Sequence, residues 1–215
     1  MNEYLQATRA IESTHPQILS RAGELTRGCQ TDSEKAVRLF DFVRDQIRYN
    51  VYMISMFIED FCASFILDAG KGYCVQKAVL LCALGRAAGI PSRLVFARIR
   101  NRRIPDKVRA RVKGDIFPAH GYNQFYLEDR WVSAAATFDA GLCRKMGVPP
   151  VTFDGQHDAC LPDRALDGGP YIEYVERYEP CADLPLDWIV ERISKIWGPD
   201  KRAWKEPPPD QPGAE

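Results

Sequence analysis

The stretch GKGYCVQKAVLLCALGRAAGIPSRLVFA, residues 70–97, decides the fold of this chain. From Cys74 to Ala88 it is apolar on nearly every side, which predicts a helix buried in the interior. Gly89 caps the end of this helix, and Pro91 prevents it from continuing. Residues 93–99 then read as a strand. We therefore expect a buried helix followed directly by a strand.

Helices are predicted before this stretch and strands after it. A capping box at Thr31 to Glu34 precedes an amphipathic helix that carries Val37, Phe40 and Val43 on one side. Further strands are expected at 122–127 and 131–134, joined as a hairpin, with a last helix at 186–197. Helices, one central buried helix and then antiparallel strands form the α+β pattern.

The composition indicates one domain and excludes several classes of function. The 215 residues are 46% hydrophobic with no internal break in composition, so we expect a single domain over residues 1–204. Residues 205–215, rich in proline and charge, are expected to be a disordered tail. With 29 basic and 29 acidic side chains, the total charge does not favour nucleic acid or an anionic membrane as a partner.

The cysteines and the N-terminus predict a cytoplasmic protein. Seven irregularly spaced cysteines in a chain of this length indicate reduced thiols rather than a disulfide framework. The N-terminus lacks an apolar signal segment, and no stretch approaches the roughly 20 apolar residues that span a bilayer. No metal site is expected, because neither Cys-x-x-Cys nor His-x-x-x-His pairs occur.

Cys74 and His120 are the candidate reactive pair. Cys74 begins the buried helix, where unpaired backbone N–H groups and the helix dipole favour a thiolate. The alternative role for Cys74 is a small core residue. His120 opens the segment GYNQFYLEDRWV, and a position at the start of that strand lets it reach the helix. Such a histidine, close to a cysteine, is a candidate general base.

Three segments together resemble the transglutaminase-like superfamily: FDFVRDQIRYNVY, the stretch at 70–97, and AHGYNQFYLEDRWVSAAATFD. The resemblance covers roughly residues 35–140. It implies a papain-like core, in which the buried helix with its cysteine packs on an antiparallel sheet that carries the histidine. The segments VTFDGQHDA and YIEYVERYEPCADLPLDWI are similar to a bacterial subgroup without an assigned substrate.

The resemblance implies a Cys-His-Asp triad, with Cys74 as the nucleophile and His120 as the base. The third member usually lies about 15 residues after the histidine, where this sequence has Ala135. Asp139 is the nearest replacement, and a carboxylate there could orient the imidazole. The alternative role for Asp139 is the cap of a short helix at 140–146. A backbone N–H at Cys74 is the expected oxyanion donor, and Gln76 is an unfavoured second candidate.

The implied activity is acyl transfer: hydrolysis or transamidation of a peptide or small amide through a thioester, without a cofactor. The alternative is a catalytically inactive binding module, which the alanine at position 135 favours. Residues 98–113 are strongly basic, with arginines that include Arg102 and Arg103. They indicate either a solvated surface segment or an anion-binding lip, and the lip adds the hypothesis of an anionic or carrier-bound substrate.

Overall fold

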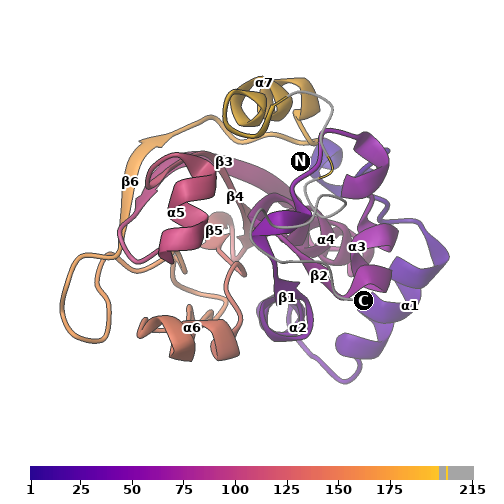
Figure 1. Cartoon of the computed structure of the whole chain (residues 1–215). Coiled ribbons are helices and arrows are strands. Elements are labelled where there is room, and N and C mark those ends of the chain that lie inside the picture. The colour runs from indigo at the N-terminus through magenta and orange to yellow at the C-terminus, as the bar shows by residue number, and fades with distance from the viewer. Residues whose placement is uncertain (199–201, 203–215) are drawn as a thin grey trace, which may run out of the picture.

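The computed structural model describes residues 1–198 and residue 202, and it has the expected α+β architecture (Figure 1). The main sheet is antiparallel, with the strand order β5-β4-β3-β6. Its strands are β3 (Ser92–Asn101), β4 (Ile116–Leu127), β5 (Arg130–Ala134) and β6 (Ile172–Arg177). A separate parallel pair joins β1 (Arg48–Tyr49) to β2 (Lys71–Gly72). The predicted tail at 205–215 lies outside the described residues.

Helix α4 lies at the centre of the molecule, with three helices on one side and the sheet on the other (Figure 1). The α-helices are α1 (Pro16–Leu25), α2 (Asp32–Gln46), α3 (Ala63–Ala69), α4 (Cys74–Ala87), α5 (Asp106–Val112), α6 (Ala140–Met146) and α7 (Leu186–Trp197). Three short 3-10 helices are η1 (Asn2–Leu5), η2 (Val51–Met53) and η3 (Ile58–Phe61). Contacts of α1, α2 and α3 with α4, and of α4 with β3 and β4, enclose the central helix.

Every residue of α4 from Cys74 to Arg86 is buried, polar ones included. Gln76 donates from Nε2 to the carbonyl of Asp60 at 2.8 Å. Arg86 donates from Nε and Nη2 to the carbonyl of Ser92, at 3.0 and 2.9 Å. Because a buried polar group without a partner is costly, these bonds allow polar side chains in the core and fix α4 to its neighbours.

Most predicted elements are confirmed. Helix α2 begins with the predicted capping box: Thr31 accepts from the Glu34 N–H at 3.1 Å, and the Glu34 carboxylate accepts from the Thr31 N–H. The strand expected at 93–99 is β3, the hairpin is formed by β4 and β5, and the last helix is α7. Strand β6 was not predicted. It lies at a sheet edge and is buried mainly at its first residue, so it lacks a strong strand pattern.

Two further observations concern the cysteines and the helices of the described residues. All seven cysteines are free thiols. Within residues 1–198 and 202, no helix has the length and apolar character needed to cross a membrane.

Candidate active site

Cys74 lies at the N-terminus of α4, directly after the β1–β2 pair. Gly70, with φ of 60°, turns the chain from α3 into β2, and β2 leads straight to Tyr73 and Cys74. The side chain of Cys74 is 9% exposed and borders a cavity. The nucleophile candidate is therefore near the surface of the core, at the end of the helix where the N–H groups are free.

Burial raises the pKa of the Cys74 thiol to about 11. Hydrogen bonds from the backbone N–H groups of Gly121, Val75 and Cys74 itself act in the opposite direction and favour the thiolate. The predicted effect of the helix N-terminus is present, but the loss of solvent around the sulfur outweighs it. The helix N-terminus thus favours the thiolate as expected, but burial keeps Cys74 a neutral thiol at pH 7.

His120 lies within β4 and not at its start. The strand begins at Ile116, because Ile116 and Phe117 pair with β3 beyond an irregularity in the register. The imidazole is 1% exposed, stacks on Tyr122 at 5.9 Å between ring centroids, and meets the edge of Tyr174 at 6.1 Å. Burial, together with the positive charge of Arg177, lowers the pKa of His120 to about 3. The ring is therefore neutral at pH 7.

Gly121 allows β4 to approach the end of α4 that carries Cys74. A Cβ atom at position 121 would lie 3.0 Å from the Cα of Val75 and 3.4 Å from the Phe96 ring. Such contacts are tighter than most real Cβ contacts, so a larger residue at this position requires β4 or α4 to shift by a few tenths of an ångström. The sequence alone could have pointed to Gly121, since a glycine inside a strand often marks the close approach of another backbone.

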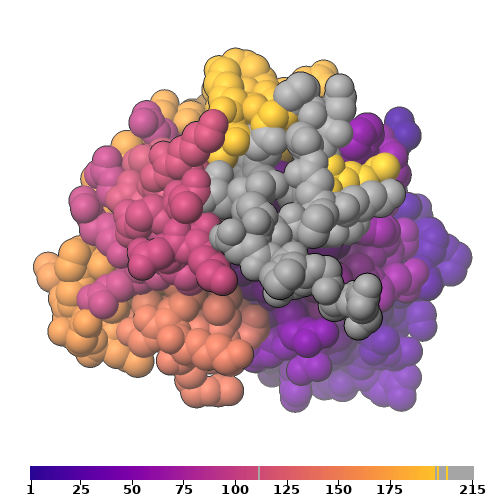
Figure 2. All heavy atoms as spheres, viewed as in Figure 1, coloured from indigo at the N-terminus to yellow at the C-terminus, as the bar shows by residue number. Residues whose placement is uncertain are grey.

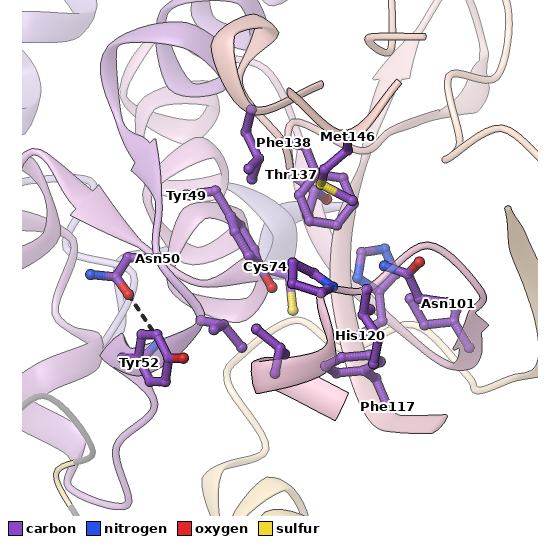
Figure 3. Close-up of a pocket in the computed structure, with 16 residues that line it drawn as sticks. Tyr49, Asn50, Tyr52, Cys74, Asn101, Phe117, His120, Thr137, Phe138 and Met146 are labelled. Atoms are coloured by element: carbon purple, nitrogen blue, oxygen red, sulfur yellow. Dashed lines mark hydrogen bonds between the residues drawn. The ribbon is translucent and has the colours of Figure 1, made fainter. Parts of the chain in front are cut away.

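Cys74 and His120 line the same cavity, which has a volume of about 200 Å³ (Figure 3). Figure 3 places the sulfur of Cys74, the Tyr49 side chain and the His120 ring among the side chains around it. No hydrogen bond joins Cys74 to His120 in the part of the chain that the structure describes. Nε2 of His120 is buried and has no hydrogen-bond partner.

Asp139 is the N-cap of α6, which is the alternative role that the sequence left open. Its Oδ1 accepts from the N–H of Leu142 at 2.8 Å, and its Oδ2 accepts from the N–H of Tyr49 at 3.2 Å. Among the described residues, no hydrogen bond joins Asp139 to His120. The carboxylate thus connects α6 to β1, and nothing in its contacts orients the imidazole.

Tyr49 is a candidate that the sequence did not single out. It lines the cavity, packs against Phe138 with ring centroids 4.7 Å apart, and has a hydroxyl with no partner among the described residues. Burial, and next the negative charge of a Cys74 thiolate, raise the pKa of Tyr49 well above its ordinary value. The hydroxyl therefore keeps its proton. Gln76 is excluded as an oxyanion donor, because its Oε1 accepts from the Tyr73 N–H at 3.1 Å and its Nε2 is bonded to Asp60.

Arg100, Arg102 and Arg103 of the basic stretch form ion pairs on the surface. Arg102 and Arg100 both contact Glu173, at 3.2 and 2.8 Å, and Arg103 contacts Asp167 at 2.7 Å. None of these arginines lines the cavity beside Cys74. Within the described residues, no group of three histidine, cysteine or carboxylate side chains is arranged to hold a metal ion.

The family model of the transglutaminase-like superfamily matches residues 20–136, more than half of the chain, and the protein belongs to this superfamily. The predicted family is thereby confirmed. Solved structures align at low identity. A candidate cysteine protease from Cytophaga hutchinsonii is 19% identical, with a TM-score of 0.49, over 62% of this chain and 40% of its own.

Two further structures align in the same way. The periplasmic domain of TgpA from Pseudomonas aeruginosa is 22% identical, with a TM-score of 0.44, over 62% of this chain and 45% of its own. A candidate protease from Parabacteroides distasonis is 18% identical, with a TM-score of 0.43, over 60% of this chain and 25% of its own. The match spans less than half of each of these three structures. No curated protein matches the chain.

Proposed function

We propose that the protein is a thiol-dependent acyl-transfer enzyme that hydrolyses or transamidates a peptide or small amide. Cys74 is the nucleophile and His120 is the general base. The observation that carries the proposal is their position: a thiol at the N-terminus of a buried helix and an unpaired neutral imidazole line one cavity. Membership of the transglutaminase-like superfamily supports the same assignment.

The reaction proceeds in two halves. The imidazole takes the thiol proton as the sulfur attacks the carbonyl carbon, which forms a C–S bond and places negative charge on the oxygen. The intermediate then collapses, the C–N bond breaks, and the imidazolium returns the proton to the leaving amine. Water or a second amine next attacks the thioester and restores the Cys74 thiol. These steps require no cofactor.

The two pKa values argue against a preformed thiolate–imidazolium ion pair in the empty site. With a thiol pKa of about 11 and an imidazole pKa of about 3, the proton stays on sulfur while the site is empty. Proton transfer must therefore accompany attack on the carbonyl. The N–H groups of Cys74 and Val75, and the hydroxyl of Tyr49, are the donors we propose for the developing oxyanion.

A second candidate is a catalytically inactive member of the superfamily that binds a ligand in this cavity. Two observations favour it: Ala135 replaces the usual aspartate, and Nε2 of His120 has no partner to orient the ring. A histidine without an orienting group is a less effective general base, since the acid partner of a triad fixes the tautomer of the imidazole.

Thiol labelling followed by peptide mapping separates the two candidates. With iodoacetamide, we expect Cys74 to react at a rate that rises about tenfold per pH unit from pH 7 to 10, because only the thiolate fraction reacts. An activated acyl ester should leave an adduct on Cys74 that hydroxylamine removes, as expected for a thioester. Cys82, which is fully buried, is the internal reference and should stay unmodified.

The inactive module predicts a different labelling pattern. The activated ester would then leave no hydroxylamine-sensitive adduct at Cys74, or no more there than at the half-buried cysteines at 29, 62, 160 and 181. That result contradicts the proposed enzyme. The cytoplasmic location stays a prediction, as does the absence of nucleic-acid and membrane partners.

A further inference from the structure

Among the described residues, no charged side chain lines the cavity beside Cys74. Its polar members are Asn50, Asn101 and Thr137, in addition to the reactive pair and two tyrosines. The remaining wall is aromatic and aliphatic, with Phe117, Phe138, Ile99, Ile104, Leu142 and Met146 among its members. A pocket of this kind gains free energy from removing apolar surface from water, and it has no cation for an acid group.

Resting on the proposed function, we infer that the acyl group transferred to Cys74 is uncharged and apolar, about the size of a phenyl ring or a six-carbon chain. The cavity of about 200 Å³ is somewhat larger than the roughly 150 Å³ that accommodates benzene in an engineered protein cavity. Four aromatic side chains in the wall, from Tyr49, Tyr52, Phe117 and Phe138, suit an aryl group equally well.

The arrangement of charges argues against an acidic acyl group. Arg102 and Arg103 of the basic stretch lie outside the cavity wall and pair with Glu173 and Asp167. Arg177, whose charge acts on His120, does not line the cavity either and donates to the Tyr122 hydroxyl at 2.8 Å. A carboxylate or phosphate entering the cavity would lose its water without gaining a cationic partner from the described wall, which is costly for a charged group. The anionic substrate expected from the basic stretch stays a prediction, and the experiment below tests it directly.

The wall of the cavity is built from segments far apart in the sequence. Val108 comes from α5 and Leu142 and Met146 from α6, and Figure 2 shows these two helices side by side on one face of the molecule. Val108 is half-buried, so its side chain can be changed without opening the main core. Ala110, on the same helix, is exposed and does not line the cavity, which makes it a matched control.

The test compares 4-nitroanilides of four acids: acetic, hexanoic, 3-phenylpropanoic and glutaric. Because each buried methylene is worth about fourfold in binding and hexanoyl has four more than acetyl, we expect kcat/KM for hexanoyl to exceed that for acetyl by roughly 200-fold. The 3-phenylpropanoyl substrate should behave like hexanoyl. Glutaryl has a similar length but carries a carboxylate, and we expect it to fall at least tenfold below hexanoyl.

A charge placed in the wall should reverse this order. Val108→Arg is expected to lower kcat/KM for hexanoyl at least tenfold and to bring glutaryl close to it or above it. Ala110→Arg adds the same charge to the same helix and should leave the ratio of the two substrates within twofold of wild type. Equal effects of the two substitutions would overturn the inference.

Binding without turnover separates this inference from the proposed function. Calorimetry with the Cys74→Ala protein should detect hexanamide and 3-phenylpropanamide but not the anion glutaramate. If these amides bind selectively while no substrate is ever turned over, the pocket inference holds and the enzyme proposal fails. If the wild type turns over acetyl, hexanoyl and glutaryl substrates at similar rates, the chemistry holds and the apolar specificity is wrong.

Discussion

Lys77 and His120 are two ionisable side chains with the same burial, 1% exposed each, and opposite surroundings. Lys77 donates from Nζ to the carbonyls of Ile47 and Arg44, at 2.6 and 3.0 Å. His120 leaves its buried Nε2 without a partner and faces the positive charge of Arg177. A protein tolerates the first arrangement because it is satisfied, whereas the second needs another reason to exist. We read Lys77 as structural and His120 as functional.

The largest expected effect comes from His120→Asn. It removes the proposed general base and should slow acylation of Cys74 by roughly 10³-fold. The free energy of unfolding should fall by about 1 to 2 kcal/mol, because the packing of the ring on Tyr122 and Tyr174 is lost although the buried Nε2 has no hydrogen bond to lose. Acylation is measured by adduct formation and stability by urea unfolding.

The control for this variant is His157→Asn. His157 is exposed and pairs with Asp154 at 2.7 Å, so both measurements should match wild type. A His120→Asn protein that is strongly destabilised but acylates normally would reverse the assignment of the two residues.

Lys77→Met is expected to reduce the free energy of unfolding by about 3 kcal/mol, since it leaves the buried carbonyls of Ile47 and Arg44 unpaired. Urea unfolding gives the value. Lys195→Met is the control: Lys195 is exposed and only loosely paired with Glu191, so its loss should cost less than about 0.5 kcal/mol.

The same residue predicts a pH dependence of stability. Burial lowers the pKa of Lys77 from 10.5 to about 7, although Asp139 and Asp45 favour the charged form. Between pH 7 and 10.5 the unfolded chain therefore binds more protons than the folded one, and stability should rise with pH in this window. The rise should be absent from Lys77→Met. A stability that falls over this range in wild type alone would contradict the assignment.

The sequence predicted the framework of the site better than its details. Continuous apolar character located α4, and a helix start followed by a glycine-proline stop placed Cys74 at its N-terminus. These patterns depend only on residues that are close in the sequence, so they can be recognised without knowing the tertiary structure. Strand β6 was missed because its pattern is weak, and the cavity wall was missed because α5 and α6 meet only through tertiary packing.

The role of Asp139 could not be decided from the sequence. An aspartate before a short helix suits a helix cap and a triad equally well. What decides between them is the N–H of Tyr49, 90 residues away in the chain, which occupies Oδ2. Similarly, the helix N-terminus indicated a thiolate at Cys74, but the degree of burial that keeps the thiol protonated depends on the packing of β4 against α4.

Gly121→Ala tests whether the packing of β4 against α4 holds His120 in its position near Cys74. Its Cβ would lie 3.0 Å from the Val75 backbone, so β4 or α4 must shift, and we expect a loss of about 2 kcal/mol in the free energy of unfolding. Acylation of Cys74 should fall as well, since the shift moves His120. Gly23→Ala is the control: it has open space around it in α1 and should stabilise the protein by about 0.5 to 1 kcal/mol. Equal stability of the two variants would mean that β4 is free to move.

Tyr49 has a backbone N–H that is hydrogen-bonded and, among the described residues, a hydroxyl without a partner. Tyr49→Phe has the smallest expected effect. Its N–H is bonded to Asp139 and its ring packs on Phe138, so the phenylalanine should keep the fold and change the free energy of unfolding by less than about 1 kcal/mol. Only the hydroxyl is lost, and if it donates to the oxyanion, acylation should slow about tenfold, less than for a fully preorganised donor. Tyr52→Phe, in the same cavity wall, should stay within twofold of wild type. A Tyr49→Phe protein that acylates at the wild-type rate would restrict the oxyanion site to the backbone N–H groups of α4, and would leave the Tyr49 hydroxyl as part of the substrate pocket alone.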